Sequence, residues 1–190
     1  MSEFALPLMT DRLTLRGFGA EDVDNLFALY GNPDVVRYLY DDVVERDAIA
    51  TRLAGYTDTV PVDGQWLSLA MEHDGTFVGQ ASLCFRSAEH RQAEIGYILH
   101  PTANGHGYAT EASARMMQLA FEELGVHRVV GRIEARNAAS ERVLQRLGMR
   151  KEAHLIQNEW VKGEWNDEII YAITEPEWRS AQVSTEQLSS

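Results

Sequence analysis

The sequence predicts an α/β (α+β) fold in which about seven strands form a mixed, mostly antiparallel twisted sheet and about four helices pack against it. Segments that alternate like strands are separated by Gly, Pro and Asp-rich turns, and other segments carry apolar side chains at helical spacing. A length of 190 residues is typical of one domain. We therefore expect residues 1–190 to form a single domain, with its core at about 10–174 and a polar, frayed C-terminal tail.

The elements of the first half follow from these patterns in order. Residues 13–16 alternate as a strand, and residues 21–30 have helical spacing that Gly31-Asn-Pro33 ends. A second helix is expected at residues 46–56. Strands are expected at 66–71 and 77–85, with a turn at His73-Asp-Gly75 that makes them a hairpin, and a further strand at 91–99.

In the second half, a long helix should follow residue 107 and end at Gly125, because its apolar residues recur at helical spacing. Residues 128–135 alternate as a strand. Asn137 is a good N-cap for a helix that Gly148 ends. Extended segments at 150–160 and 168–173 complete the sheet, with a turn at Lys162-Gly163.

The segment from Glu94 to Glu111 is the most informative part of the chain. A strand ends before Pro101, and Gly105 and Gly107 immediately precede the long helix. A strand, a glycine loop and a helix N-terminus present a concave set of free backbone N–H groups, and the helix dipole adds partial positive charge. Glycine lets the backbone approach a phosphate closely. The segment therefore predicts a site for a phosphate-bearing ligand.

Four interpretations of this loop compete. A dinucleotide-binding loop would need glycine where Thr110 stands, and a P-loop would need a lysine that is not there. The stretch Asn104-Gly-His-Gly-Tyr-Ala109 fits an acyl-CoA pyrophosphate loop, Gln/Arg-x-x-Gly-x-Gly/Ala, except that Asn104 replaces Gln or Arg. The fourth interpretation is a tight strand-to-helix turn without a ligand.

A second signature downstream favours the acyl-CoA interpretation. The strand at 128–135 is followed directly by Asn137-Ala-Ala-Ser140 at the start of a helix. At 3.6 residues per turn, Asn137, Ser140 and Leu144 fall on one face of that helix. By itself this would be an ordinary capped helix, but it follows the glycine loop at the distance that is expected of the second signature of an acyl-CoA site.

These motifs resemble the GNAT superfamily of acyl-CoA N-acyltransferases, and within it the branch typified by the ribosomal-protein N-terminal acetyltransferases RimJ and RimL. The resemblance covers about residues 10–174. The matching segments are Thr10-Asp-Arg-Leu-Thr-Leu-Arg16, Glu94-Ile-Gly-Tyr97, Gly105-His-Gly-Tyr-Ala-Thr-Glu-Ala112, Asn137-Ala-Ala-Ser-Glu-Arg-Val-Leu144, Leu147-Gly148 and Gly163-Glu-Trp-Asn-Asp167.

The resemblance implies splayed central strands and acetyl-CoA as cosubstrate, with no metal. The pantetheine arm would pair with the backbone of one splayed strand, and the glycine loop would hold the pyrophosphate. The residues expected to bind the cofactor are Ile98, Leu99, Asn104, Gly105, His106, Gly107, Tyr108, Ala109, Thr110, Asn137 and Ser140.

Glu94 and Ser140 are the expected catalytic residues. Glu94 shares a strand face with Gly96 and Ile98, so it is our candidate for deprotonating the amine, through water; a solvated glutamate or a structural ion pair is the alternative. The resemblance makes Ser140 the candidate proton donor to the thiolate, and a capping hydroxyl is its alternative. Many relatives carry a tyrosine acid where this chain has Leu144, which shifts that role to Ser140 or to water.

Composition and charge limit the partners, the cellular location and the metal sites that we expect for this chain. A net charge of −12 argues against nucleic acid as a partner, and no segment has the length of a membrane span. A lone Cys84, expected to be buried, and the lack of a signal-like N-terminus indicate the cytoplasm. The six histidines, among them His100 and His106, show no metal-ligand spacing. Aromatic residues could line an acceptor pocket or belong to the core: Trp66, Tyr97, Trp160 and Trp165.

The sequence thus predicts an N-acetyltransferase that transfers the acetyl group of acetyl-CoA to a primary amine by direct attack in a ternary complex. The amine is either a protein N-terminal α-amine or a small molecule. A non-catalytic acyl-CoA sensor of the same fold is the alternative. A homodimer is expected from family habit and from the apolar C-terminal hairpin.

Overall fold

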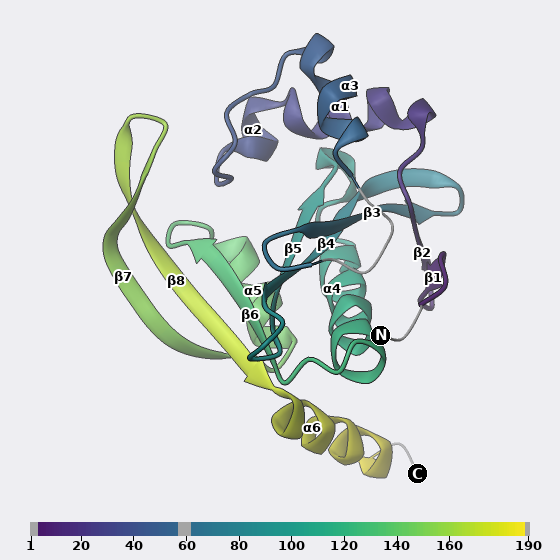
Figure 1. Cartoon of the computed structure of the whole chain (residues 1–190), viewed down its shortest axis with the longest axis vertical. Coiled ribbons are helices and arrows are strands. Elements are labelled where there is room, and N and C mark those ends of the chain that lie inside the picture. The colour runs from purple at the N-terminus through teal and green to yellow at the C-terminus, as the bar shows by residue number, and fades with distance from the viewer. Residues whose placement is uncertain (1–3, 57–61, 189–190) are drawn as a thin grey trace.

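A computed structural model describes residues 4–56 and 62–188. In this part of the chain, eight strands form one open sheet in the order β1-β2-β3-β4-β5-β6-β8-β7 (Figure 1). The strands are β1 (Leu8–Met9), β2 (Leu13–Arg16), β3 (Trp66–His73), β4 (Thr76–Ser87), β5 (Gln92–Leu99), β6 (Arg128–Glu134), β7 (Arg150–Val161) and β8 (Glu164–Thr174). The expected mixed, mostly antiparallel sheet is confirmed, with one more strand than predicted, the two-residue β1.

Six α-helices are present in the same residues, where four were expected. They are α1 (Val23–Tyr30), α2 (Pro33–Val36), α3 (Arg46–Ala54), α4 (Tyr108–Gln118), α5 (Ala138–Arg146) and α6 (Glu175–Leu188). Helices α1 to α3 gather at one end of the sheet, whereas α4 lies along strands β4 and β5 (Figure 1). A π-helical turn, Leu119–Glu123, extends α4. No helix of the described residues is both long and apolar enough to cross a membrane.

Two apolar clusters form the core. The larger cluster lies between the sheet and α4, where Leu69, Leu83 and Met116 are fully buried. The smaller cluster joins α1 to α3 through Leu26, Leu29 and Ile49. Cys84 is buried on β4, as expected, and this burial raises the pKa of its thiol.

The C-terminal segment is helical up to Leu188, so the expectation of a frayed tail is wrong. The Glu177 carboxylate accepts hydrogen bonds from the backbone N–H and the hydroxyl of Thr174, which fixes the helix start. Trp178 is only 8% exposed, and its ring lies 5.2 Å from that of Phe121. These two features stabilise a segment whose composition is otherwise polar.

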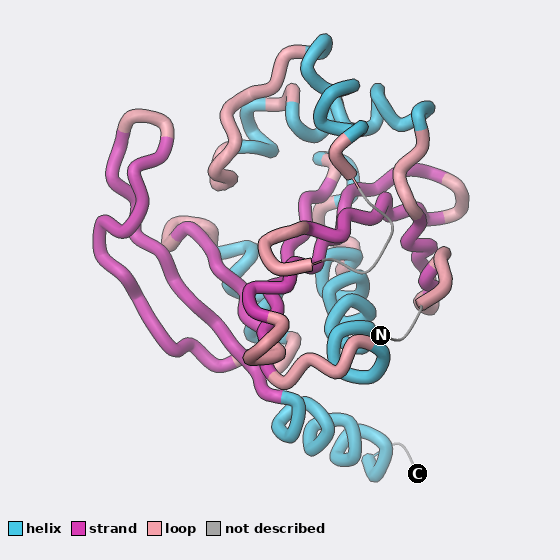
Figure 2. The backbone as a smooth tube through the Cα atoms, in the orientation of Figure 1, coloured by secondary structure: helices cyan, strands magenta, loops and turns pink. Residues whose placement is uncertain are grey.

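The centre of the sheet opens between β5 and β6. These strands run parallel and pair over three residues only, Gln92 with Arg128, Ala93 with Val129, and Glu94 with Val130. Beyond Glu94 the strands diverge, and the space between their ends is visible in the backbone trace of Figure 2. The expected splayed strands are therefore present, and among the described residues no strand pairs with the edge of β5 from Ile95 to Leu99 on that side.

Candidate functional site

A cavity of about 620 Å³ opens where β5 and β6 diverge. Three segments line it: the end of β5, the glycine loop and one face of α5. Of the residues predicted to bind cofactor, the structure brings these to the cavity: Ile98, Leu99, Asn104, Gly105, His106, Gly107, Ala109, Thr110, Asn137 and Ser140. Tyr108 is the exception. Its side chain is buried, and its ring lies 5.5 Å from the His106 ring and 5.0 Å from the guanidinium carbon of Arg12.

The glycine loop offers unpaired N–H groups on the cavity side. In the part of the chain that the structure describes, none of the N–H groups from Gly105 to Thr110 donates to an acceptor. Three carbonyls of the loop, in contrast, have hydrogen-bond partners. The Asn104 carbonyl contacts Nδ1 of His106, the His106 carbonyl accepts from Arg12, and the Gly107 carbonyl accepts from the N–H of Glu111. Such a set of free amides at a helix N-terminus is suited to a phosphate.

Glycine is required at two positions of this loop. Gly105 and Gly107 both have φ of 82°, in the left-handed region that other residues adopt only with strain. The loop therefore depends on both glycines for its shape.

A second cavity, of about 120 Å³, adjoins the first. The two share five lining residues: Tyr38, Leu39, Tyr97, Asn137 and Ser140. Glu94 lines only the second cavity, together with Arg132, Glu134 and Leu144 among others. Glu94 and Ser140, predicted from separate motifs, therefore meet at one composite site.

Glu94 lies on β5 and is 7% exposed. Its Oε2 accepts from Nε and Nη2 of Arg86, at 2.7 and 2.6 Å, while Oε1 has no hydrogen-bond partner among the described residues. Burial raises the pKa of Glu94 above its ordinary value, and Arg86 partly opposes this rise. The side chain thus combines the structural ion pair with a carboxylate oxygen that remains available.

Ser140 lies in the first turn of α5, but its hydroxyl does not cap the helix. Asn137 is the N-cap, and its Oδ1 accepts from the N–H of Ser140 at 3.1 Å. Oγ of Ser140 lies 2.9 Å from the hydroxyl of Tyr97. Burial raises the pKa of Tyr97, which keeps this phenol protonated. Leu144 is buried, with its side chain against Gly131, so it supplies no proton donor to the site.

Arg142 and Arg146 also line the larger cavity, and the sequence did not single them out. They lie one turn apart on α5, and neither has a carboxylate partner within residues 4–56 and 62–188. Helical spacing could have identified them from the sequence, because residues 139, 142, 143 and 146 fall on a single face of the helix. They bring positive charge to a cavity in an otherwise acidic chain.

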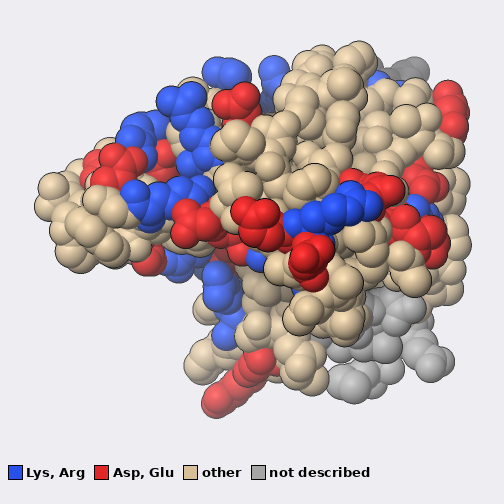
Figure 3. Space-filling view, turned by 90° about the horizontal axis from the view of Figure 1, so that it is seen from above, with Lys and Arg blue, Asp and Glu red and all other residues tan. Residues whose placement is uncertain are grey.

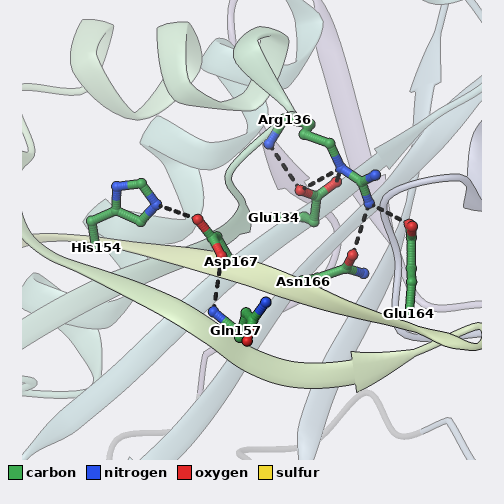
Figure 4. A network of polar contacts seen from close by, with 7 residues as sticks. All are labelled: Glu134, Arg136, His154, Gln157, Glu164, Asn166 and Asp167. Atoms are coloured by element: carbon green, nitrogen blue, oxygen red, sulfur yellow. Dashed lines mark hydrogen bonds and ion pairs between the residues drawn. The ribbon is translucent and has the colours of Figure 1, made fainter.

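The start of α5 is held by a network around Arg136 (Figure 4). Arg136 contacts Glu134 on β6 and both Glu164 and Asn166 on β8. Asp167 of β8 accepts from the N–H of Gln157 and contacts His154. The network ties the end of β6 to the β7–β8 hairpin and so fixes the place where Asn137 begins the helix.

The surface seen from above in Figure 3 carries positive and negative side chains beside one another. Within the described residues, no group of three or more His, Cys, Asp or Glu side chains is arranged to hold a metal ion. Trp160 and Trp165 contact each other edge to face on the β7–β8 hairpin and line neither cavity.

Comparison with known proteins agrees with this geometry. The acetyltransferase (GNAT) domain family matches residues 12–150. The uncharacterized N-acetyltransferase YnaD of Bacillus subtilis is 28% identical over 172 residues, which cover 90% of this chain and 98% of that protein. A GNAT-family acetyltransferase from Bacillus anthracis superposes with a TM-score of 0.81 at 25% identity, covering 90% of this chain and 99% of the other.

Two further structures share the fold at 20% identity and a TM-score of 0.75 each. One is a spermidine N-acetyltransferase from Vibrio cholerae in complex with CoA and spermine, covering 88% of this chain and 98% of that one. The other is RimL, a ribosomal L7/L12 α-N-protein acetyltransferase in complex with CoA, covering 88% and 96%. With the family match over residues 12–150 and the site in place, the chain belongs to the GNAT acetyltransferase family and is an acetyl-CoA-dependent N-acetyltransferase.

Proposed function

We propose that this enzyme acetylates a primary amine by direct attack on acetyl-CoA in a ternary complex, at the junction of the two cavities. The observation that carries the proposal is the shared wall of Tyr97, Asn137 and Ser140. On one side of this wall lie free amides suited to a phosphate, and on the other lies the Glu94 carboxylate. The thioester of acetyl-CoA would lie between them, where the acceptor amine can attack it directly without a covalent enzyme intermediate.

The larger cavity would hold CoA. Its pyrophosphate would accept hydrogen bonds from the N–H groups of Gly105 to Thr110, which need no side-chain charge. The pantetheine arm would pair with the open edge of β5 at Ile98 and Leu99. Asn137 uses Oδ1 as the helix cap, so its Nδ2 group is the part left for a pantetheine carbonyl.

Glu94 and Ser140 would carry out the proton transfers. Oε1 of Glu94 would take a proton from the amine through water, which frees the nitrogen lone pair to attack the thioester carbonyl. When the carbon–sulfur bond breaks, Ser140 would donate a proton to the thiolate, and the second proton that the attacking nitrogen loses as the amide forms would return to Ser140 through water. The raised pKa of Glu94 suits a base that must accept a proton near neutral pH.

The acceptor is proposed as a primary amine that carries positive charge. A net charge of −12 attracts cations to the protein. Structures of this fold include one bound to spermine and one that acts on a ribosomal protein N-terminus, so both acceptor classes are compatible with the scaffold. We place the chain in the RimJ/RimL-like branch of the family because of its Thr10–Arg16 and Glu94–Tyr97 motifs.

The test is release of free CoA thiol from acetyl-CoA in the presence of spermidine or of a short peptide with a free N-terminus. We expect release above the rate of hydrolysis with at least one acceptor, and one added acetyl group in its mass spectrum. The same acceptors with blocked amines are the control. If CoA bound but no amine of either class was acetylated, the proposed amine acceptor would be wrong.

A further inference from the structure

The segment Thr10 to Arg12, just before β2, contacts the glycine loop. Nη1 of Arg12 donates to the carbonyl of His106 at 3.0 Å. Nε of Arg12 donates to Oε2 of Glu111 at 2.7 Å, and the backbone N–H of Arg12 donates to Oε1 at 2.9 Å. The hydroxyl of Thr10 donates to the same Oε1 at 2.6 Å. A segment about 95 residues away in sequence is thereby fixed to the loop.

The bond from Arg12 to His106 determines where a loop amide points. In a planar trans peptide, the C=O of one residue and the N–H of the next point in opposite directions. Because Arg12 holds the His106 carbonyl on its own side, the N–H of Gly107 is turned the other way. Gly107 lines the large cavity, and Arg12 does not. Arg12 therefore acts from behind the loop.

The bonds from Arg12 and Thr10 to Glu111 reduce the repulsion between the Glu111 carboxylate and a phosphate bound at the loop. Glu111 lies in the first turn of α4, close to the amides that face the cavity. Although partial burial opposes it, the hydrogen bonds from Thr10 and Arg12 lower the pKa of Glu111, so the carboxylate is ionised. An unpaired carboxylate there would repel a bound phosphate. Arg12 is its cationic partner, at 2.6 Å between Nη2 and Oε2.

We propose that Arg12 is a positioning residue for the cofactor pyrophosphate: it orients the Gly107 amide toward the ligand and neutralises Glu111, without itself contacting the ligand. This inference rests on the proposed placement of CoA in the large cavity. It gives the Thr10-Asp-Arg12 motif, which the proposed chemistry leaves unused, a role in donor binding.

The test compares two acetyl donors in an Arg12→Met variant. Acetyl-CoA carries the pyrophosphate, and S-acetylpantetheine lacks it. We expect kcat/KM for acetyl-CoA to fall about tenfold, through KM, which is the size expected for losing hydrogen bonds of a charged group. The dissociation constant of CoA, measured by calorimetry, should rise by the same factor. With S-acetylpantetheine, kcat/KM should remain within about twofold of wild type, well below that charged-group effect.

Arg150→Met is the matched control. The side chains of Arg12 and Arg150 are both 46% exposed, and Arg150 also forms ion pairs, with Glu152 of β7 and Glu177 of α6. This variant should leave both donors unaffected. In Arg12→Met/Glu111→Gln, removal of the unpaired charge should restore part of the lost CoA affinity.

Equal losses with both donors would show that Arg12 only stabilises the fold, and an unchanged CoA affinity would also overturn the inference. Gly107→Val tests the placement of CoA independently of Arg12, because a valine at a φ of 82° distorts the loop itself. If Gly107→Val abolished CoA binding while Arg12→Met left it intact, only the role of Arg12 would be wrong. If neither variant affected CoA binding, the proposed placement of CoA would be wrong as well.

Discussion

At the scale of single residues, the proposed chemistry depends on two polar groups, the Ser140 hydroxyl and the Glu94 carboxylate, and each has a different hydrogen-bond partner. Ser140 shares its hydroxyl with Tyr97, whereas Glu94 shares one carboxylate oxygen with Arg86. A tyrosine hydroxyl is the stronger acid of the two alcohols, so Tyr97 is the natural donor in its bond with Ser140. This direction leaves the proton of Ser140 free to point into the cavity.

Ser140→Ala should lower kcat by about 10²-fold, the lower end of the range for a positioned acid, because the departing thiolate loses its nearest donor. The dissociation constant of CoA should stay close to that of wild type, since the glycine loop and Asn137 remain. Steady-state kinetics and calorimetry measure the two quantities. A kcat within about twofold of wild type, far below the usual general-acid effect, would assign the proton to water instead.

Arg86→Met should shift the acidic limb of the pH profile of kcat/KM to higher pH. Arg86 favours the charged form of Glu94, so its removal raises further a pKa that burial has already raised. At any pH on that limb, less of Glu94 is deprotonated and the rate is lower. Arg128→Met, which removes a pair with Glu152 on β6 and β7, should leave the limb in place. An unmoved limb in Arg86→Met would show that another group titrates.

Much of the site was predictable from residue patterns because short motifs encode local backbone geometry. Gly105, Gly107 and Asn137 specify a loop and a helix start, and the structure places them as expected. The partners of these residues were not predictable. Arg12 reaches the loop, and Tyr97 reaches Ser140, only through the tertiary fold.

At the scale of secondary-structure elements, strong periodicity identified the long strands and helices. The elements that were missed are short or depend on packing. β1 has two residues, and α2 is one turn that Asn32 caps ahead of Pro33. Helix α6 begins with the capping sequence Thr174-Glu-Pro-Glu177, a signal that the polar composition of the segment obscured.

Trp178→Ala should destabilise the protein by about 3 kcal/mol, because a buried indole against Phe121 is what docks α6. Chemical denaturation measures this loss. Val183→Ala on the same helix is the control, since that side chain is 53% exposed and should cost little. If the two variants were equally stable, α6 would not be docked in solution.

At the scale of the whole molecule, the β7–β8 hairpin stands out from the rest of the sheet (Figure 1). It exposes Ile156, Trp160 and Trp165 at 68, 60 and 56%. Large apolar side chains that are exposed together commonly mark a contact surface. We propose that a second copy of this chain covers them.

Light scattering at micromolar concentration should therefore give about twice the 21.4 kDa of one chain. Replacing both Trp160 and Trp165 with serine should shift the mass toward the monomer, because the apolar contact is lost. Wild type at the monomer mass would contradict the dimer.

The three-residue pairing of β5 with β6 has a consequence for rigidity. It is the only ladder that joins strands β1–β5 to strands β6–β8 in the described sheet, so the two groups of strands are joined by a short hinge line. A cofactor lying along the open edge of β5 would contact both groups of strands and restrict their motion relative to each other. Donor binding should then slow amide exchange in both groups of strands, and at one hundred times its dissociation constant it should stabilise the fold by about 2.7 kcal/mol.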